Sequence, residues 1–187
     1  APLKAVLTLT FISFLLFMLF RSAAGNSVST YLTTYLTTEK GLAAGLASIV
    51  FGLSPLVGLL STIIGGYVGD RFGWKRAFSF IFPMVIFALF FVLASPTSVF
   101  TVLFYVIYGF LNSMAMPISS SLVARIVPSQ YRGTAYSLQF IPMNIIGIVM
   151  PVLLSFLIDL SGLWIIFPVA MIFYFFALVV VLFLKIK

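Results

Sequence analysis

Long apolar runs alternate with short polar connections along the whole chain. A helix needs about 20 mainly apolar residues to cross the hydrocarbon core of a bilayer, and six runs are long enough. The predicted helices span about 4–36, 42–68, 77–94, 99–124, 134–159 and 163–184. Because the connections are short, the pattern predicts a single all-α transmembrane domain over residues 1–187.

Polarity differs among the six runs in a regular order. The first and fourth carry Arg, Asn, Thr and Tyr side chains, whereas the third and sixth are almost purely Phe, Ile, Leu and Val, as contact with lipid requires. The fifth is interrupted by prolines and a glycine. The second has small residues at four-residue spacing, which predicts a ridge for close helix packing: Ser54, Gly58, Thr62 and Gly66.

This order repeats after three helices, and single positions match at an interval of 89 residues. The matching pairs are Asp70 with Asp159, Gly73 with Gly162 and Phe78 with Phe167. Copies that are separated by three crossings have opposite orientations in the membrane. The pattern therefore predicts a 3+3 inverted repeat, which is typical of secondary transporters.

Composition supports the membrane assignment and excludes several classes of protein. Hydrophobic residues make up 63% of the 187 residues and charged residues 7%, far from the quarter that soluble domains carry. The chain has no Cys and no His, so we expect no disulfide, no metal site and no cofactor. With no paired acids at mid-membrane depth either, we expect no enzyme.

The net charge of +7 does not indicate a nucleic-acid partner, because the basic residues lie between apolar runs. Lys40 alone lies on one side of the predicted membrane, and Arg21 lies inside the first helix. The other side holds eight: Lys4, Arg71, Lys75, Arg76, Arg125, Arg132, Lys185 and Lys187. The positive-inside rule predicts cytoplasmic termini and a cell membrane location, plasma or inner.

The beginning of the chain permits two interpretations. Ala1 without a preceding Met suggests a processed, trimmed or excised polypeptide. Residues 5–20 followed by RSAAG resemble a signal peptide. We reject the second interpretation, because the number of spans and the charge topology both require this segment.

The stretch GGYVGDRFGWKRA, residues 65–77, contains the pattern Gly-x-x-x-Asp-Arg-x-Gly-x-Lys-Arg from Gly66 to Arg76. It resembles the motif of the major facilitator superfamily in the loop after the second helix of each half. The segment PSQYRGTA and the pair Asp159 and Gly162 resemble the equivalent loops. The resemblance implies one six-helix half of a twelve-helix transporter, the C-terminal one, because YVIYGFLNS lacks the Arg usual in a first half.

The resemblance implies a gate at the cytoplasmic ends of the helices. Asp70 would latch this half to the other, and the alternative is a charged turn that only fixes topology, for Lys75 and Arg76 above all. Asp159 would be an outer gate or a cap. The implied gating residues are Gly66, Asp70, Arg71, Gly73, Lys75, Arg76 and Arg132.

In this family the first and fourth helices of a half line a central cavity, flanked by the second and fifth. Interhelical hydrogen bonds and aromatic packing are the alternative role for each polar residue there. The implied candidates for substrate contact are Arg21, Asn26, Thr30, Tyr105, Tyr108, Asn112, Gln139 and Met143.

Arg21 lies about 25 Å along a helix from Lys4, deep in the bilayer. A buried cation needs a partner, and no carboxylate of this chain is expected at that depth. The candidates are a missing half, a second copy, backbone carbonyls or an anionic substrate. A structural arginine that pairs or snorkels is an equal alternative, since Arg21 falls off the helical stripe of Asn26, Thr30 and Thr33.

Together these features predict a small-molecule transporter that works by alternating access in a lipid bilayer. Six helices do not enclose a path, so either an N-terminal half exists as a separate or removed polypeptide, or two copies pair. A dimer would bring two Arg21 side chains toward one cavity, which favours the excised or split half. The rival prediction is a six-helix membrane scaffold without transport activity.

Overall fold

A computed structural model describes residues 8–184 of the chain. In this range six helices are long and apolar enough to cross a membrane, which confirms the predicted all-α architecture. The predicted start of the first helix, at residue 4, lies outside the described residues, and the other ends lie within four residues of the predicted ones. The helices are α2 (Leu9–Thr38), α3 (Ala44–Phe72), α4 (Trp74–Ala94), α5 (Ser98–Ile126), α6 (Arg132–Ser161) and α7 (Ile166–Phe183); short 3-10 turns, η1 (Ser129–Tyr131) and η2 (Leu163–Ile165), precede α6 and α7.

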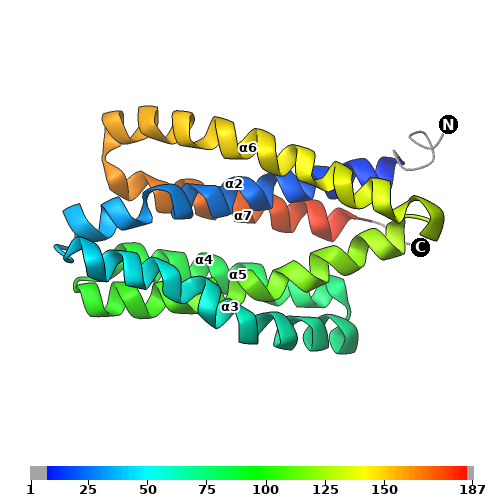
Figure 1. Cartoon of the computed structure of the whole chain (residues 1–187), viewed down its shortest axis with the longest axis horizontal. Helices are drawn as coiled ribbons and strands as arrows, with labels where there is room; N and C mark the ends of the chain where they lie inside the picture. The colour runs from blue at the N-terminus through cyan, green and yellow to red at the C-terminus, as the bar shows by residue number, and fades with distance from the viewer. Residues whose placement is uncertain (1–7, 185–187) are drawn as a thin grey trace.

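Consecutive helices run antiparallel, so that α2 begins and α7 ends at the same end of the bundle (Figure 1). Helix α2 packs mainly on α6 and α7, whereas α5 packs mainly on α3 and α4. Helices α4 and α7 join the two groups. The first helix of each predicted repeat therefore lies against the last two helices of the other repeat.

The buried residues of α4 and α7 repeat at the same interval of 89 residues. Every buried residue of α7 lies 89 residues after a buried residue of α4. The pairs are Ala77 with Ile166, Phe78 with Phe167, Ile81 with Ala170, Val85 with Tyr174, Ala88 with Ala177 and Val92 with Val181. The helix before each copy ends at a glycine with positive φ, 80° at Gly73 and 93° at Gly162. The inverted repeat predicted from the sequence is thus present in the packing.

Helices α3 and α5 approach closely along small residues of α3. A Cβ added at Gly65 would lie 2.7 Å from Cα of Met114. The predicted ridge is wrong in its second half, because neither Thr62 nor Gly66 is buried. Residues spaced four apart rotate by about 40° per step around an α-helix. The row of α3 residues that contacts α5 therefore includes one spacing of three residues, which keeps it on one face. It consists of Gly58, Ser61, Gly65 and Gly69.

The expectation that α4 and α7 face lipid holds for one side of each helix only. Their inner sides form an aromatic core in which Phe82 contacts Phe78 and Tyr174, with ring centroids 5.1 and 5.8 Å away. Their outer sides expose residues such as Phe80 and Phe175. In the most apolar segment of each helix, 22% of the residues of α3 and of α6 are buried, against 44% for α4 and 33% for α7. The flanking helices therefore have the largest uncovered apolar surface of this unit.

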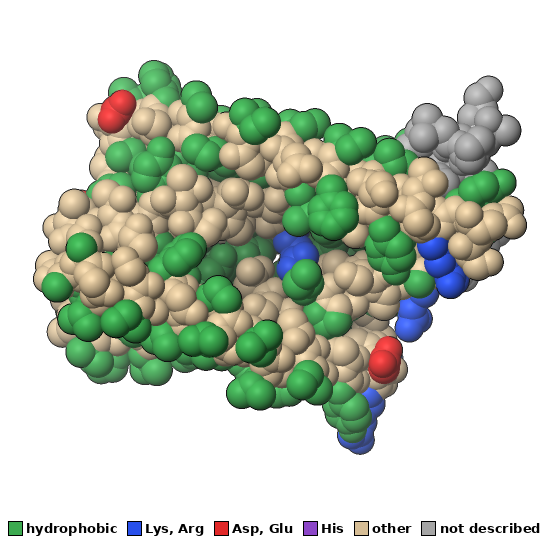
Figure 2. Space-filling view, in the orientation of Figure 1, with side chains coloured by type: hydrophobic (Ala, Val, Ile, Leu, Met, Phe, Trp, Pro, Cys, Tyr) green, Lys and Arg blue, Asp and Glu red, His purple; other side chains and the backbone are tan. Residues whose placement is uncertain are grey.

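Basic side chains gather at the end of the bundle where α2 begins (Figure 2). The described residues there are Arg71, Lys75, Arg76, Arg125 and Arg132. The opposite end holds Glu39, Lys40 and Asp159. The predicted basic residues Lys4, Lys185 and Lys187 lie outside the described residues.

Candidate functional site

A cavity of about 310 Å³ lies between α2, α3, α5 and α6, near the middle of the bundle. It opens on the face that Figure 2 shows, where basic side-chain atoms are visible in a central hollow. Most of its wall comes from α2 and α5, the two helices in which the sequence placed polar residues. The remaining wall comes from residues 51–55 of α3 and from Met143 of α6.

The structure brings together most of the residues that the resemblance implied as substrate contacts. Thr30 and Gln139 are not in the cavity wall. Thr30 is exposed, and Gln139 is buried with 9% of its surface exposed. The predicted residues that do line the cavity are Arg21, Asn26, Tyr105, Tyr108, Asn112 and Met143. Their contact with a substrate remains a prediction.

The α2 wall is rotated relative to the stripe that the sequence analysis favoured. Its centre is formed by Ser22, Gly25 and Ser29, at a spacing of three and four residues. At 100° per residue, Asn26 lies at one edge of this wall and Thr30 beyond it. The spacing of these small residues was the signal in the sequence. Ser54, which the sequence analysis assigned only to helix packing, also lines the cavity.

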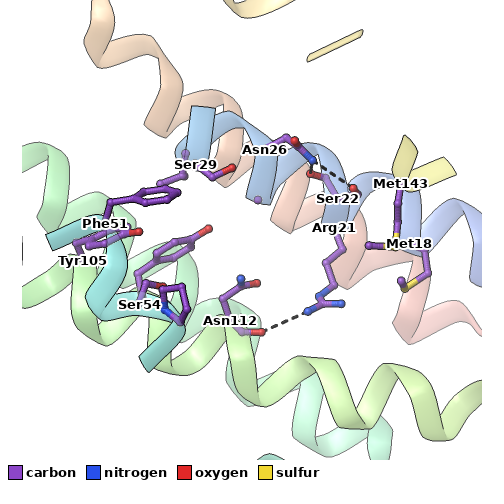
Figure 3. A pocket seen from close by; sticks show the side chains of 14 residues that line it. Met18, Arg21, Ser22, Asn26, Ser29, Phe51, Ser54, Tyr105, Asn112 and Met143 are labelled. Atoms are coloured by element: carbon purple, nitrogen blue, oxygen red, sulfur yellow. Dashed lines mark hydrogen bonds between the residues drawn. The ribbon is translucent and has the colours of Figure 1, made fainter. Parts of the chain in front are cut away.

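Arg21 extends from α2 across the cavity toward α5 (Figure 3). Its Nη2 donates a hydrogen bond to the backbone oxygen of Asn112 over 3.4 Å, which is long for such a bond. Its Nε is buried and has no hydrogen-bond partner among residues 8–184. The side-chain carboxylates of this chain belong to Glu39, Asp70 and Asp159, all exposed at helix ends. The guanidinium therefore has no acidic side chain of this chain as a partner.

A buried tyrosine of α7 orients Asn112. The Tyr174 hydroxyl donates to Asn112 Oδ1 over 2.9 Å and is hydrogen-bonded to the Tyr108 hydroxyl over 3.1 Å. The sequence analysis missed Tyr174, although a single tyrosine in an otherwise apolar run is a usable signal, since a buried phenol needs a polar partner. Because Oδ1 accepts from Tyr174, the amide nitrogen of Asn112 is left as a donor.

The residues implied in gating lie at the basic end, and no hydrogen bond or ion pair joins their side chains to one another. Asp70 is exposed, and its carboxylate has no partner in the described part of the chain. Arg71 points back along α3 and donates to the Tyr67 hydroxyl over 2.6 Å. Lys75 donates to the backbone oxygen of Leu182 over 3.1 Å, which ties the start of α4 to the end of α7.

The remaining residues of this set either stabilise turns between helices or lie without close neighbours. Gly73 has a φ of 80°, a conformation that favours glycine, between α3 and α4. Arg132 donates to the backbone oxygens of Ala124 and Val127 over 2.7 and 3.4 Å, and so satisfies carbonyls at the end of α5. Arg76 is exposed. A Cβ added at Gly66 would meet nothing within 4 Å.

Asp159 lies in the last turn of α6, at the end opposite to the basic residues. It is exposed, and its side chain caps no backbone N–H among residues 8–184. A carboxylate at a helix C-terminus is disfavoured by the helix dipole. Its predicted role as an outer gate or cap remains a prediction.

A model of the Major Facilitator Superfamily matches residues 7–187. The chain belongs to this superfamily. It is 29% identical over 57% of its length to a "Na(+), Li(+), K(+)/H(+) antiporter" of Planococcus maritimus, covering 26% of that protein. It is 30% identical over 71% of its length to the uncharacterized MFS-type transporter YqjV of Bacillus subtilis strain 168, covering 32% of it. The chain thus spans about a quarter to a third of the length of these curated relatives.

Solved structures of larger transporters contain the same fold. The peptide transporter POT in complex with sulfate matches 92% of this chain with a TM-score of 0.81 and 17% identity, over 37% of its own length. A bacterial homologue of the iron transporter ferroportin in an outward-facing state matches 95% with a TM-score of 0.76 and 17% identity, over 45% of its length. With the family match over residues 7–187 and six helices long and apolar enough to cross a membrane among the described residues, the chain is a multi-pass membrane protein of this transporter superfamily.

Proposed function

We propose that this chain is the C-terminal half of a secondary transporter that moves a small molecule across the cell membrane by alternating access. The observation that carries the proposal is the polar cavity at mid-depth in a six-helix unit of this superfamily. Arg21 lies about 18 Å along α2 from Leu9, and Asn112 is equally far from both ends of α5. Substrate sites of secondary transporters lie at this depth, between two repeats or halves.

A second six-helix half would cover the face on which the cavity opens. Pro55 lines the cavity, and Thr62 and Gly66 lie within about 20° of it around α3. Among residues 8–184, nothing lies within 4 Å of a Cβ added at Gly66. An open stripe of α3 therefore runs from the cavity to Asp70. We infer an N-terminal half as this partner in preference to a second copy, because two Arg21 side chains in one cavity would repel each other.

In this proposal Asp70 latches such a partner. It lies in the last turn of α3, where the helix dipole disfavours a negative charge. An arginine or a helix N-terminus of the second half would relieve this cost. The alternative is that the charged residues 70–76 only fix the orientation of the chain in the membrane.

The charge distribution supports cytoplasmic termini. Five described basic residues lie at the end where α2 begins and α7 ends, against Lys40 with two acidic residues at the other end. Cytoplasmic loops carry the excess of Lys and Arg in membrane proteins.

Because the sequence has no cysteine, a single introduced cysteine can be labelled specifically, which allows a direct test of alternating access. Ser29→Cys puts one thiol in the cavity wall of the complete transporter, paired with a cysteine-free second half. A membrane-impermeant thiol reagent is expected to label this thiol when added from either side. Labelling from one side only would contradict alternating access.

Two exposed positions test the orientation in the same background. Gln130→Cys, at the basic end, is expected to be labelled from the cytoplasm, and Thr97→Cys, at the opposite end, from outside. The reverse pattern would refute the proposed topology. A six-helix scaffold would show the same two end labels, but Ser29→Cys would not become accessible from both sides.

A further inference from the structure

Arg21 has the one buried side-chain nitrogen or oxygen without a hydrogen-bond partner among residues 8–184. Its one hydrogen bond, to Asn112, is long, and its Nε is buried without a partner. A guanidinium has five N–H donors in a planar fork that fits two oxygens of one acidic group. Most of this capacity is unused in the chain as it stands.

We propose that the cavity binds the carboxylate of an amphiphilic small-molecule substrate through Arg21, an inference that rests on the transport function proposed above. A charge at this depth requires an opposite charge or extensive hydrogen bonding. The acidic side chains of this chain lie at helix ends, so none can supply it. The side chain reaches into the space that a substrate would occupy (Figure 3).

The charge of the cavity favours a monoanion. Arg21 is the one charged residue in the cavity wall, and the polar residues near it, such as Tyr108 and Asn112, are neutral. A single positive charge balances a carboxylate, whereas a phosphate carries a charge of about −1.5 to −2 near neutral pH. A carboxylate therefore fits the site better than a phosphate does.

Hydrogen-bond donors beside Arg21 extend the anion site. Tyr174 occupies Oδ1 of Asn112 and so leaves the amide nitrogen to donate. Asn112 is in the cavity wall, and its own backbone carbonyl accepts the hydrogen bond from Arg21. A carboxylate that accepts from both side chains would form an ion pair with Arg21 and a directional hydrogen bond with the Asn112 amide. Charge-assisted hydrogen bonds of this kind are the strong ones in proteins.

The rest of the wall fits an apolar body. Met18, Val28, Phe51, Pro55 and Met143 contribute apolar surface around the same space. A volume of about 310 Å³ is at the lower end of the range for small-molecule sites, about 300–1,000 Å³. The cavity therefore combines one anion-binding wall with apolar walls, as an amphiphilic carboxylic acid requires.

The test uses matched ligands on the complete transporter that carries Ser29→Cys. Benzoate and hexanoate are compared with their neutral analogues benzamide and hexanamide, and with phenyl phosphate. The measurement is the ligand concentration that halves the rate of alkylation of the cavity thiol by a neutral maleimide. We expect the carboxylates to protect at concentrations at least 10-fold below those of the amides and of phenyl phosphate.

Variants of Arg21 assign the effect to the guanidinium. Arg21→Gln is expected to remove the preference for carboxylates over amides, and Arg21→Lys to keep part of it, because the charge remains and the fork is lost. Arg125→Gln is the matched control, since it removes an exposed positive charge far from the cavity. The preference of this variant for carboxylates over amides should equal that of the transporter that carries only Ser29→Cys.

Each outcome decides between the inference and its rivals. Equal protection by acids and amides would overturn the inference. Stronger protection by phenyl phosphate would overturn the assignment to a carboxylate. If the thiol is reached from both sides while carboxylates do not protect it, only this inference fails. If carboxylates protect a thiol that is reached from one side only, the binding site stands and the proposed transport mechanism fails.

Discussion

Two adjacent glycines of α3 have opposite surroundings, so the same substitution should have opposite effects on stability. Gly65 faces α5, where an added Cβ would lie 2.7 and 2.9 Å from Cα and C of Met114 and closer still to its carbonyl oxygen. Gly66 faces open space, with nothing within 4 Å of an added Cβ. We expect Gly65→Ala to destabilise the unit and Gly66→Ala not to.

The magnitude follows from the obstacle. Carbon atoms pack at about 3.5–4.0 Å, so α3 and α5 would have to separate by nearly 1 Å, and a backbone obstacle does not rotate away as a side chain does. Overpacking of this kind costs about 1–3 kcal/mol, and more when the structure cannot adjust. Alanine in place of glycine in a helix recovers about 1 kcal/mol. Because the obstacle at Gly65 is backbone, we take the upper end of this range, about 3 kcal/mol. The net loss for Gly65→Ala is then about 2 kcal/mol, and Gly66→Ala should gain up to about 1 kcal/mol.

The assay is thermal unfolding of the purified chain in detergent micelles, followed by helical circular dichroism and by the fluorescence of Trp74 and Trp164. For a chain of this size about 2 kcal/mol corresponds to a fall of roughly 4–8 °C in Tm. Equal midpoints for Gly65→Ala and Gly66→Ala would refute the close α3–α5 contact. A loss in Gly66→Ala alone would show that the other side of α3 is the packed one.

Three further substitutions test separate parts of the structure. Tyr174→Phe removes the donor to Asn112 Oδ1 and should lower the free energy of unfolding by about 1–2 kcal/mol, measured as a fall in Tm in micelles. Gly73→Ala forces a side chain onto a φ of 80° and should cost about 1–3 kcal/mol in the same assay, whereas Gly133→Ala, in α6 with open space around it, should not. Asp70→Asn should leave Tm unchanged, within about 0.5 kcal/mol, because the carboxylate has no partner in residues 8–184; uptake by the complete transporter should fall, and unchanged uptake would contradict the latch.

The helices were predictable because crossing a bilayer requires a run of apolar residues long enough to be seen in the sequence alone. The α5 wall of the cavity was equally accessible, since Tyr105, Tyr108 and Asn112 share one face at spacings of three and four residues. In both cases the information is local. A single helix carries it, whatever its neighbours are.

The remaining features of the cavity and of the packing depended on which helices contact each other, and a single helix does not reveal this. Tyr174 belongs to the most apolar helix of the chain, and only the contact of α7 with the other group brings its hydroxyl to Asn112. Arg21 is off the stripe that contains Asn26, yet its long side chain reaches the cavity. The ridge on α3 failed at Thr62 and Gly66 because the helical drift of about 40° per four residues carries them out of the contact with α5.

The position of the cavity follows from the exchange of first helices between the two repeats. Since α2 packs on α6 and α7, and α5 packs on α3 and α4, the two polar helices face each other with few direct contacts. The bonds from Arg21 and Tyr174 to Asn112 cross this boundary between the two groups. A ligand that binds there adds contacts to both groups at once, so it should raise the unfolding temperature by mass action. The α4–α7 contact, which includes the aromatic pair Phe82 and Tyr174, holds the two groups together. Because α2 and α5 make few direct contacts, the polar cavity lies between them.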